Sequence, residues 1–443
     1  FSRVPSMTRR REETSMSDPM NSKPGEAISM SASDRPTASA GATSGGKSVR
    51  FPGKNAGLES VQVWEYDAGT SRRSRDVASE TVQALTAPED FPPIDAAIVS
   101  GDRVAIALDP NVPNIEALIT GTLQTISRTP ADAVENVVWE EATDETMQRI
   151  RDAAGDCPVT RHTSGVRESL CYLCADVDAE PIYLNRSLVE ADFVLPIVAV
   201  RPSNLARRGD LTGIFPSLCD SSTRLRFAAK IREGRASDPA MKSGHSIAEE
   251  VPWLLGVQLI LNVTANSQGL AGEIHAGTLE AMAKRITPTL RRPDPVPPPA
   301  SLVIAALDGD QQQQTWENAA RAADAAIAYA QPEATIVIWS SVDEPPGGAL
   351  LALDVEDSLD SIDETPATRE EDEFPEWDRF ADLAGRLKEV TGRHRLLLYS
   401  RIDPELIEPL GIGVIASAQE LANLSRGFES CGVLRAASFA GGH

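Results

Sequence analysis

Residues 101–113 read GDRVAIALDPNVP, and this stretch decides the fold. Within it, Arg103–Leu108 is a nearly continuous apolar run that ends at the turn Asp109–Asn111. A strand that is apolar along its length is typical of a parallel sheet covered by helices on both faces. The residues that follow, Ile115–Ile126, have their apolar positions at helical spacing. The stretch therefore predicts a strand, a turn and a helix in succession.

The same alternation continues through the first half of the chain. We expect strands at Val134–Trp139, Val159–Arg161, Pro181–Leu184, Phe193–Val200 and Val257–Val263, and helices at Asp144–Ala154 and Gly277–Arg285. Arg167–Leu173 is expected to be helical or a short connector. Buried strands that alternate with helices indicate βαβ units with a parallel sheet.

A proline-rich stretch, Arg291–Ala300 (RRPDPVPPPA), separates the two halves of the chain and predicts a semi-rigid linker. Beyond it we expect strands at Leu302–Leu307, Thr335–Trp339, Arg395–Tyr399 and Val414–Ile415, and helices at Thr315–Ala330, Phe380–Val390 and Ala418–Gly427. The fold class is therefore α/β, with two α/β domains whose sheets are mainly parallel. The expected boundaries are 51–290 for the N-terminal domain, 291–300 for the linker and 301–443 for the C-terminal domain.

Two segments have a composition that does not suit a packed core. Residues 1–50 are rich in Ser, Thr, Ala and Gly and hold one aromatic residue, so we expect a disordered tail. The sequence begins with Phe1, and Met7, Met16 and Met20 are alternative starts. Residues 354–382 carry thirteen acidic residues against two arginines. A solvated insertion is the expected structure, and a docking segment for a basic protein partner is the alternative.

The overall negative charge argues against certain classes of binding partner. The chain has 443 residues and a formal net charge of −23. Nucleic acids and anionic membranes attract basic surfaces, so this balance argues against both. No apolar run approaches the roughly 18 residues of a membrane helix. Five cysteines do not make a disulfide scaffold in a chain of this length, and no apolar leader is present, so we expect a cytoplasmic protein.

Two short motifs carry little weight. Gly41–Ser48 (GATSGGKS) satisfies the phosphate-loop pattern, but a working loop lies between a strand and a helix. Here polar residues precede the motif and Pro52 follows it, so we interpret it as a chance match. Cys171 and Cys174 form a single CxxC within an apolar run. Zinc needs about four ligands, so buried structural thiols are the expected outcome.

Charged side chains follow two of the expected strands. Asp109 comes directly after the first strand, where open α/β sheets bind ligands, although Asp is also a common turn residue. Arg201, Arg207 and Arg208 follow the strand that ends at Val200. Guanidinium groups there can bind a carboxylate or phosphate, and exposed loop charges are the alternative. We expect these arginines to bind a small carboxylate substrate.

Two histidines have positions that suit proton transfer. His162 follows the expected strand Val159–Arg161, and His275 lies between a strand and a helix. Either could act as a general base, and a structural histidine with satisfied hydrogen bonds is the alternative for both. We take His162 and Asp109 as the candidate catalytic residues.

The order of these segments resembles the lactate racemase family, whose members are nickel-dependent racemases and epimerases of 2-hydroxy acids. Residues 101–113 resemble the family's strand followed by D-x-T-R-P, and Leu170–Asp192 (LCYLCADVDAEPIYLNRSLVEAD) resembles its L-x-Y-L-G…N-[KR]…EAD stretch. Val257–Ala281 resembles the strand and helix that close its N-terminal domain, and Asp403–Ala422 resembles its C-terminal end. The resemblance covers most of residues 90–440. It implies a lactate-racemase-like fold and racemase or epimerase activity on a small 2-hydroxy acid.

The resemblance also implies a nickel pincer nucleotide, attached in the family to a lysine in a GG-x-K loop after a Pro-His pair. The corresponding stretch here is Arg201–Pro216 (RPSNLARRGDLTGIFP). Ser203 stands at the place of the histidine, and Thr212 or Gly213 at the place of the lysine. Of the family's pattern Asp109 remains, and His162 is a candidate match to its conserved H-D stretch, while the cofactor-binding residues of this chain stay unknown.

Two function hypotheses follow. The first is a racemase or epimerase of a small 2-hydroxy acid, as the family resemblance implies. The second is a non-catalytic relative that binds a small anion through Arg201, Arg207 or Arg208, or docks a protein partner through its acidic insertion. The missing lysine favours the second hypothesis for mechanism. We expect Asp109, His162 and Arg201 to face one cleft.

Overall fold

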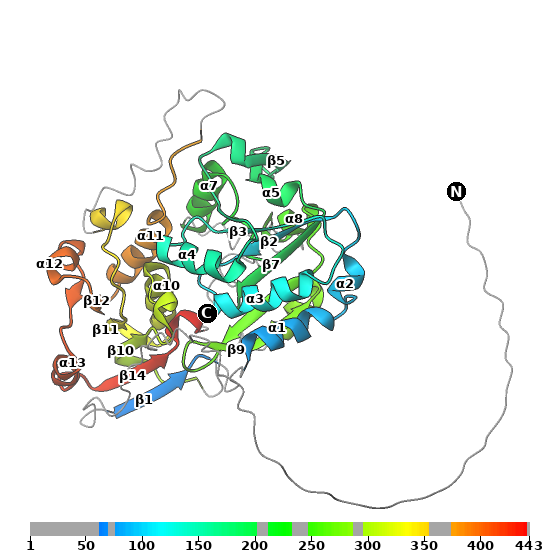
Figure 1. Ribbon diagram of the computed structural model, residues 1–443. Coiled ribbons are helices and arrows are strands. Elements are labelled where there is room, and N and C mark those ends of the chain that lie inside the picture. The colour runs from blue at the N-terminus through cyan, green and yellow to red at the C-terminus, as the bar shows by residue number, and fades with distance from the viewer. Residues whose placement is uncertain are drawn as a thin grey trace, which may run out of the picture. The chain divides into compact units, whose positions relative to one another are not determined.

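The computed structural model describes residues 62–69, 76–201, 211–232, 247–286, 296–353 and 374–440 (Figure 1). The predicted tail 1–50, residues 291–295 of the predicted linker and residues 354–373 of the acidic insertion lie outside the described residues. The described part has two six-stranded sheets and one hairpin. The predicted α/β class with mainly parallel sheets is confirmed.

The first sheet has the strand order β4-β3-β2-β7-β8-β9. Its members are β2 (Arg103–Leu108), β3 (Ala133–Val138), β4 (Val159–Arg161), β7 (Phe193–Ala199), β8 (Ile260–Ala265) and β9 (Ala271–Gly277). All neighbours are parallel except β8 and β9. The sequence pattern did not predict β9, and the strand predicted at Val257–Val263 begins three residues before β8. The turn at 266–270 (NSQGL) is a hairpin signal that the prediction did not use.

Alternate residues of β2 face two different cores, which explains its continuous apolar sequence. Val104, Ile106 and Leu108 pack on the side of the first group of helices, and Ala105 and Ala107 pack on the opposite side. The first group is α1 (Val77–Thr86), α2 (Ile94–Ala97), α3 (Ile115–Ile126) and α4 (Asp144–Ala154), and the opposite side has α7 (Ser221–Arg232) and α8 (Ile247–Leu254). Figure 1 shows α1, α3 and α4 along one side of the sheet.

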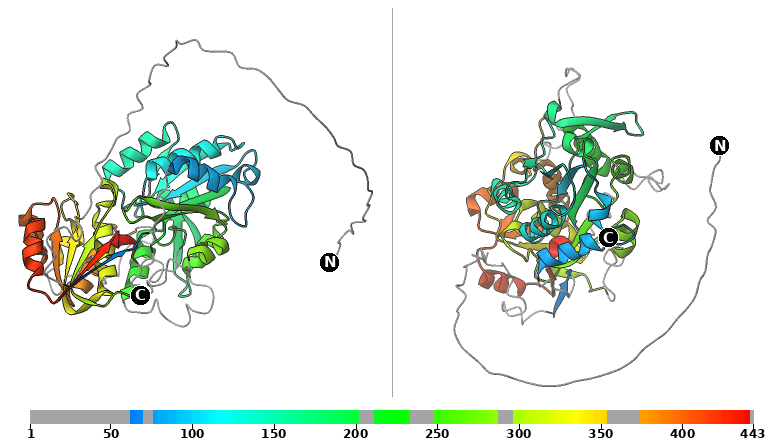
Figure 2. Two further views of the ribbon diagram at one scale, coloured as in Figure 1. Left: turned by 90° about the horizontal axis from the view of Figure 1, so that it is seen from below. Right: turned by 45° about the vertical axis from the view of Figure 1, so that its right-hand side comes forward.

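A two-stranded hairpin extends from this half of the chain (Figure 2). It pairs β5 (Leu170–Ala175) with β6 (Pro181–Asn185), and the short helix α5 (Arg186–Val189) follows. The prediction of a helix or connector at 167–173 is therefore wrong beyond the 3₁₀ turn Arg167–Ser169, because pairing with β6 makes the rest a strand. Cys171 and Cys174 lie on β5 and are partly exposed, not buried as expected.

The second sheet is parallel throughout, with the order β1-β14-β10-β11-β12-β13. Its strands are β1 (Gln62–Asp67), β10 (Ala300–Ala306), β11 (Ala330–Trp339), β12 (Arg395–Tyr399), β13 (Gly413–Val414) and β14 (Ser430–Arg435). One face packs on α10 (Trp316–Ile327) and α11 (Ala381–Thr391), and the other on α13 (Ala418–Ser425). The described residues also form the helices α9 (Leu279–Ile286) and α12 (Pro404–Ile407).

The first strand of the chain belongs to the second sheet. β1 pairs with β14 along its whole length, from Gln62 with Ser430 to Asp67 with Arg435 (Figure 2). Arg435 also binds Glu65 of β1 at 2.7 Å and Asp308 at 3.3 Å. The expected boundary at residue 51 therefore assigns β1 to the wrong sheet. No local pattern shows that a strand pairs with a segment about 370 residues away.

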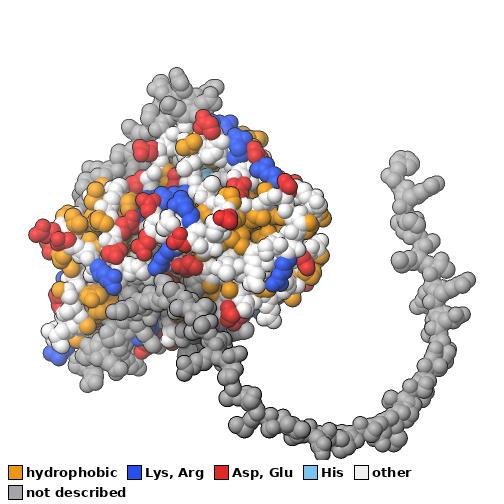
Figure 3. Space-filling model, in the orientation of Figure 1, with side chains coloured by type: hydrophobic (Ala, Val, Ile, Leu, Met, Phe, Trp, Pro, Cys, Tyr) orange, Lys and Arg blue, Asp and Glu red, His pale blue; other side chains and the backbone are white. Residues whose placement is uncertain are grey.

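Within the described parts of the chain, no helix combines the length and the apolar composition needed to cross a membrane. On the face of the molecule shown in Figure 3, the basic side chains lie among acidic ones.

The packing of α1 against α3 gives a test of the fold. A Cβ added at Gly121 of α3 would lie 2.4 Å from the Ala78 carbonyl oxygen and 2.8 Å from Thr81 Cβ, both on α1. Gly121→Ala is expected to lower the free energy of unfolding by about 1–3 kcal/mol, because the two helices must separate. Urea unfolding measures the change.

Gly385 of α11 provides the matched control, since an added Cβ there has no atom within 4 Å. Gly385→Ala should raise the free energy of unfolding by about 0.5–1 kcal/mol through helix propensity. Equal effects of the two substitutions would contradict the close contact between α1 and α3.

Candidate functional site

A buried ion pair joins the ends of two central strands. Asp109 follows β2 and Arg201 lies two residues after β7, and these neighbouring parallel strands end at the same edge of the sheet. Arg201 Nη1 donates to Asp109 Oδ2, which also accepts from the Ala199 backbone N–H at 3.3 Å. Both charged residues are 1% exposed. Two of the predicted site residues thus meet, but inside the protein.

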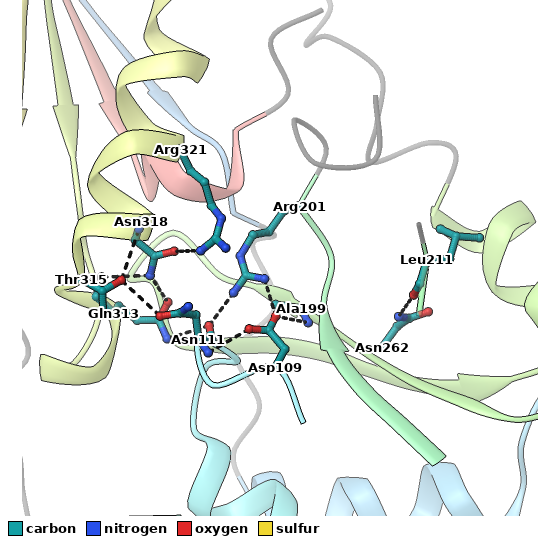
Figure 4. Close-up of polar contacts among 10 residues, drawn as sticks. All are labelled: Asp109, Asn111, Ala199, Arg201, Leu211, Asn262, Gln313, Thr315, Asn318 and Arg321. Carbon is teal, nitrogen blue, oxygen red and sulfur yellow. Dashed lines mark hydrogen bonds and ion pairs between the residues drawn. The ribbon is translucent and has the colours of Figure 1, made fainter. Parts of the chain in front are cut away.

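Asn111 carries this network across to the second half of the chain (Figure 4). Its backbone N–H donates to Asp109 Oδ1 at 2.9 Å, and its carbonyl oxygen accepts from Arg201 Nη2 at 2.7 Å. The same carbonyl accepts from Gln313 Nε2 at 3.1 Å, and the Asn111 side-chain oxygen accepts from Thr315 Oγ1 at 3.2 Å. Gln313 and Thr315 precede α10, which packs on the second sheet. These hydrogen bonds therefore connect the part of the chain around the first sheet with the part around the second sheet.

The network ends on a second buried arginine. Asn318, in the first turn of α10, donates from its backbone N–H to Thr315 Oγ1 at 3.2 Å, and its Oδ1 accepts from Arg321 Nη1 at 2.8 Å. Arg321 is 8% exposed. Figure 4 shows Arg321 and Arg201 side by side, one from each half of the structure.

A cleft with a cavity of about 60 Å³ lies beside this network. Its walls come from both halves of the chain and include Asn111, Glu141, Arg224, Glu317, Arg321 and Arg386. A cavity of this size holds a few water molecules or one small organic molecule. It is the natural candidate for a ligand site, because polar groups from several elements converge on it.

The arginines of the cleft differ in how their charge is balanced. Three have a carboxylate partner: Arg224 with Glu140 at 3.1 Å, Arg379 with Glu344 at 2.9 Å, and Arg386 with Asp382 at 3.2 Å. Arg321 has no carboxylate oxygen within 4.0 Å among the residues that the structure describes. Its guanidinium group therefore keeps donors for another partner.

The surroundings of Arg321 favour an anion. Burial lowers the pKa of Arg321 to about 9, and the positive charges of Arg201 and Arg386 add to this effect, while the negative charges of Asp109 and Glu317 oppose it. The side chain is still charged at neutral pH. A bound anion would relieve the repulsion among these guanidinium groups and replace the water that Arg321 has lost.

Residues 374–380 form a short segment, the strap, that crosses the cleft. Its Phe374 ring lies 5.4 Å from that of Tyr183, and Arg224 stacks on Trp377 at 3.8 Å. Trp377 and Arg379 line the cleft. At its other end, Asp378 accepts hydrogen bonds from Ala349 N at 2.5 Å and Phe380 N at 2.9 Å. The strap therefore contacts both halves of the chain at the cleft.

His162 lies apart from the Asp109–Arg201 pair. It follows β4, two strands away from β2, and is 0% exposed. Nε2 lies 2.8 Å from the Cys219 carbonyl oxygen and Nδ1 lies 3.1 Å from Asn185 Nδ2. Burial lowers the pKa of His162 to about 3. Both ring nitrogens thus have hydrogen-bond partners within the protein, as expected for a structural histidine. A catalytic role of His162 stays an untested prediction.

The expectation that Asp109, His162 and Arg201 face one cleft is wrong, since each is at most 1% exposed and none of them lines the cleft. The structure places Asp109 and Arg201 behind the cleft, where they position Asn111. Arg207 and Arg208 lie outside the described residues, so their predicted role in binding a carboxylate is not tested.

The sequence analysis did not single out Arg321 or Glu317. Both lie on α10, which was predicted as a helix over Thr315–Ala330. Glu317, Arg321 and Asp324 follow at intervals of four and three residues, which places their charges on one side of that helix. Charged residues at helical spacing within an otherwise apolar helix were therefore the available signal.

Comparisons with known proteins identify the fold. No family model and no curated protein sequence matches the chain. The structure of the lactate racemase apoprotein from Thermoanaerobacterium thermosaccharolyticum is similar, with a TM-score of 0.63 and 14% identity over 88% of this chain and 96% of that chain. A structural-genomics crystal structure from Thermotoga maritima has a TM-score of 0.53 and 9% identity, over 79% of this chain and 93% of that chain. The chain has a lactate-racemase-like fold, which confirms the predicted resemblance at this level.

Removing the negative charge of Asp109 should be costly. Asp109→Asn leaves Arg201 buried without its counter-charge, so the free energy of unfolding should fall by about 3–5 kcal/mol. Glu280→Gln, which breaks the exposed pair between Glu280 and Lys284, is the control and should cause no measurable change. Similar losses in urea unfolding for both variants would contradict the structural role of the buried pair.

The burial of His162 predicts a dependence of stability on acid. An unfolded histidine titrates near pH 6.5, so between about pH 6.5 and 3 the unfolded chain binds a proton that the folded chain excludes. Stability should therefore fall as the pH drops through this range, by up to about 1.4 kcal/mol per pH unit from this residue. His162→Gln should remove this contribution. An unchanged pH dependence of the unfolding free energy in the variant would show that His162 titrates normally.

Proposed function

We propose that the protein binds a small carboxylate in the cleft, with Arg321 as the group that receives the carboxylate. The observation that carries this proposal is the buried guanidinium of Arg321, which borders the cavity and has no carboxylate partner within 4.0 Å among the described residues. A guanidinium group matches a carboxylate in shape and charge, and the pair is strengthened where water is excluded.

The network behind the cleft prepares Arg321 for this role. Asn318 holds Nη1 at 2.8 Å, and Asn318 is itself held by Thr315 and Gln313, which contact Asn111. A donor that is already oriented loses little freedom when it binds. The Arg321 guanidinium group is therefore held in a fixed position on α10, which suits recognition of one small anion.

Racemisation or epimerisation of a small 2-hydroxy acid is the second candidate function, because the similar structure from Thermoanaerobacterium thermosaccharolyticum is a lactate racemase apoprotein. The residues present here do not fit a lysine-attached nickel pincer nucleotide. The sequence has no lysine between Lys54 and Lys230. Thr212, which stands near the place of that lysine, is 2% exposed and accepts a hydrogen bond from Ile214 N at 3.2 Å.

The metal-ligating side chains also do not fit the nickel cofactor. Imidazole nitrogens are common nickel ligands, but both nitrogens of His162 have hydrogen-bond partners within the protein. Among the described residues, no group of three or more His, Cys, Asp or Glu side chains is placed to hold a metal ion. We therefore derive no chemical step through this cofactor.

Titration calorimetry on the full chain tests the proposal. Propionate should bind, and propionamide, which has the same shape without the charge, should bind at least about tenfold more weakly. Arg321→Gln should reduce propionate affinity by about 10- to 100-fold, because the charged hydrogen bonds are lost. Arg393→Gln is the control, since this arginine is 62% exposed and lies outside the cleft.

Two results would overturn the proposal. One is equal affinity for propionate and propionamide, and the other is full propionate affinity in a folded Arg321→Gln variant. Conversion of one lactate enantiomer into the other by the purified chain would favour the second candidate function.

A further inference from the structure

Two carboxylate oxygens at the cleft lack hydrogen-bond donors. Glu141 Oε2 and Glu317 Oε1 are both buried and accept no hydrogen bond within the part of the chain that the structure describes. Both residues line the cleft together with Arg321. A buried acceptor without a donor is costly, so this arrangement calls for a donor from a ligand.

The two residues approach the cleft from different directions. Glu141 lies in the turn after β3, in the first half of the structure, and Glu317 lies in the first turn of α10, in the second. Arg321 is one helical turn beyond Glu317 and therefore on the same side of α10. A small molecule in the cleft can thus meet a cation and two acceptors.

The protein's own arginines do not fill these two acceptors. Arg224 binds the other oxygen of Glu141, Oε1. Arg379 Nη2 lies 3.6 Å from Glu317 Oε1, which is an ion-pair distance but not a hydrogen bond. The stacking of Arg224 on Trp377 and the 2.9 Å contact of Arg379 with Glu344 hold both guanidinium groups in these positions.

The electrostatic interaction between Glu141 and Glu317 favours a cation between the two carboxylates. Burial raises the pKa of Glu317, and the negative charge of Glu141 raises it further, against the opposing charges of Arg379 and Arg321. The two carboxylates therefore interact unfavourably when both are charged. A positive group bound between them would stabilise the charged form of each.

The number of missing donors distinguishes the chemical classes of ligand. A hydroxyl group has one hydrogen to donate, so it can satisfy one of the two oxygens. An ammonium group has three donors and a positive charge, so it can satisfy both and balance their charge. A carboxylate ligand that also carries an ammonium group therefore fits the polar groups of the cleft better than its hydroxy analogue.

We propose that the ligand of the cleft is a small zwitterionic α-amino acid, whose carboxylate binds Arg321 and whose ammonium group binds Glu141 and Glu317. The inference rests on the proposed carboxylate site and adds the second half of the ligand. The cavity of about 60 Å³ favours a small side chain, such as that of glycine, alanine or serine.

Three ligands of nearly equal size test the proposal: alanine, lactate and propionate, which differ only in the group on the second carbon. Titration calorimetry with the full chain at neutral pH should show alanine binding at least about tenfold more tightly than lactate or propionate. Glu141→Gln and Glu317→Gln should each reduce alanine affinity by about tenfold or more while propionate affinity is kept or increased. Glu405→Gln, at an exposed position on α12, is the control.

The outcomes separate the two proposals. If all three ligands bind equally and still require Arg321, the carboxylate site stands and the amino-acid inference fails. If lactate binds more tightly than alanine, the inference fails in favour of a hydroxy acid. If none of the three binds, both proposals fail. Thermal unfolding identifies a variant that does not fold, and the test then rests on the other glutamate.

Discussion

The buried ion pair of Asp109 and Arg201 is the interaction on which the site depends. It ties the ends of β2 and β7 together and fixes the Asn111 carbonyl, which accepts hydrogen bonds from Arg201 and from Gln313 of the second half of the chain. A buried ion pair is costly unless hydrogen bonds satisfy its remaining groups, and here three backbone and side-chain donors serve Asp109. The pair therefore stabilises one arrangement of the cleft walls.

This arrangement has a consequence for charge. Arg201 brings a positive charge close to Arg321, and Arg386 adds another, so that burial and repulsion both lower the pKa of Arg321. The carboxylates of Asp109, which binds Arg201, and of Glu317 balance the charge of Arg321 only in part. The same network that joins the two halves thus leaves a cation at the cleft whose natural partner is an anion. The network around Asp109 and Arg201 thus accounts both for the stability of the cleft walls and for their preference for an anion.

The sequence predicted the local structure well and the long-range pairings poorly. The helices Ile115–Ile126 and Asp144–Ala154 were predicted with their observed ends, because the spacing of their apolar residues is visible in the local sequence. The pairing of β1 with β14 and the burial of Arg321 beside the cleft were missed, because both depend on contacts between segments far apart in the chain. Asp109 and Arg201 were found through their positions at strand ends, although their partner was each other.

The central claim is that this lactate-racemase-like fold carries an arginine-lined ligand cleft in place of a lysine-attached metal cofactor. The most direct measurement is the intact mass and nickel content of the full chain, purified from cells that make the pincer nucleotide. The claim predicts the mass of the unmodified chain without stoichiometric nickel. A covalent mass increment accompanied by one nickel ion per chain would contradict it.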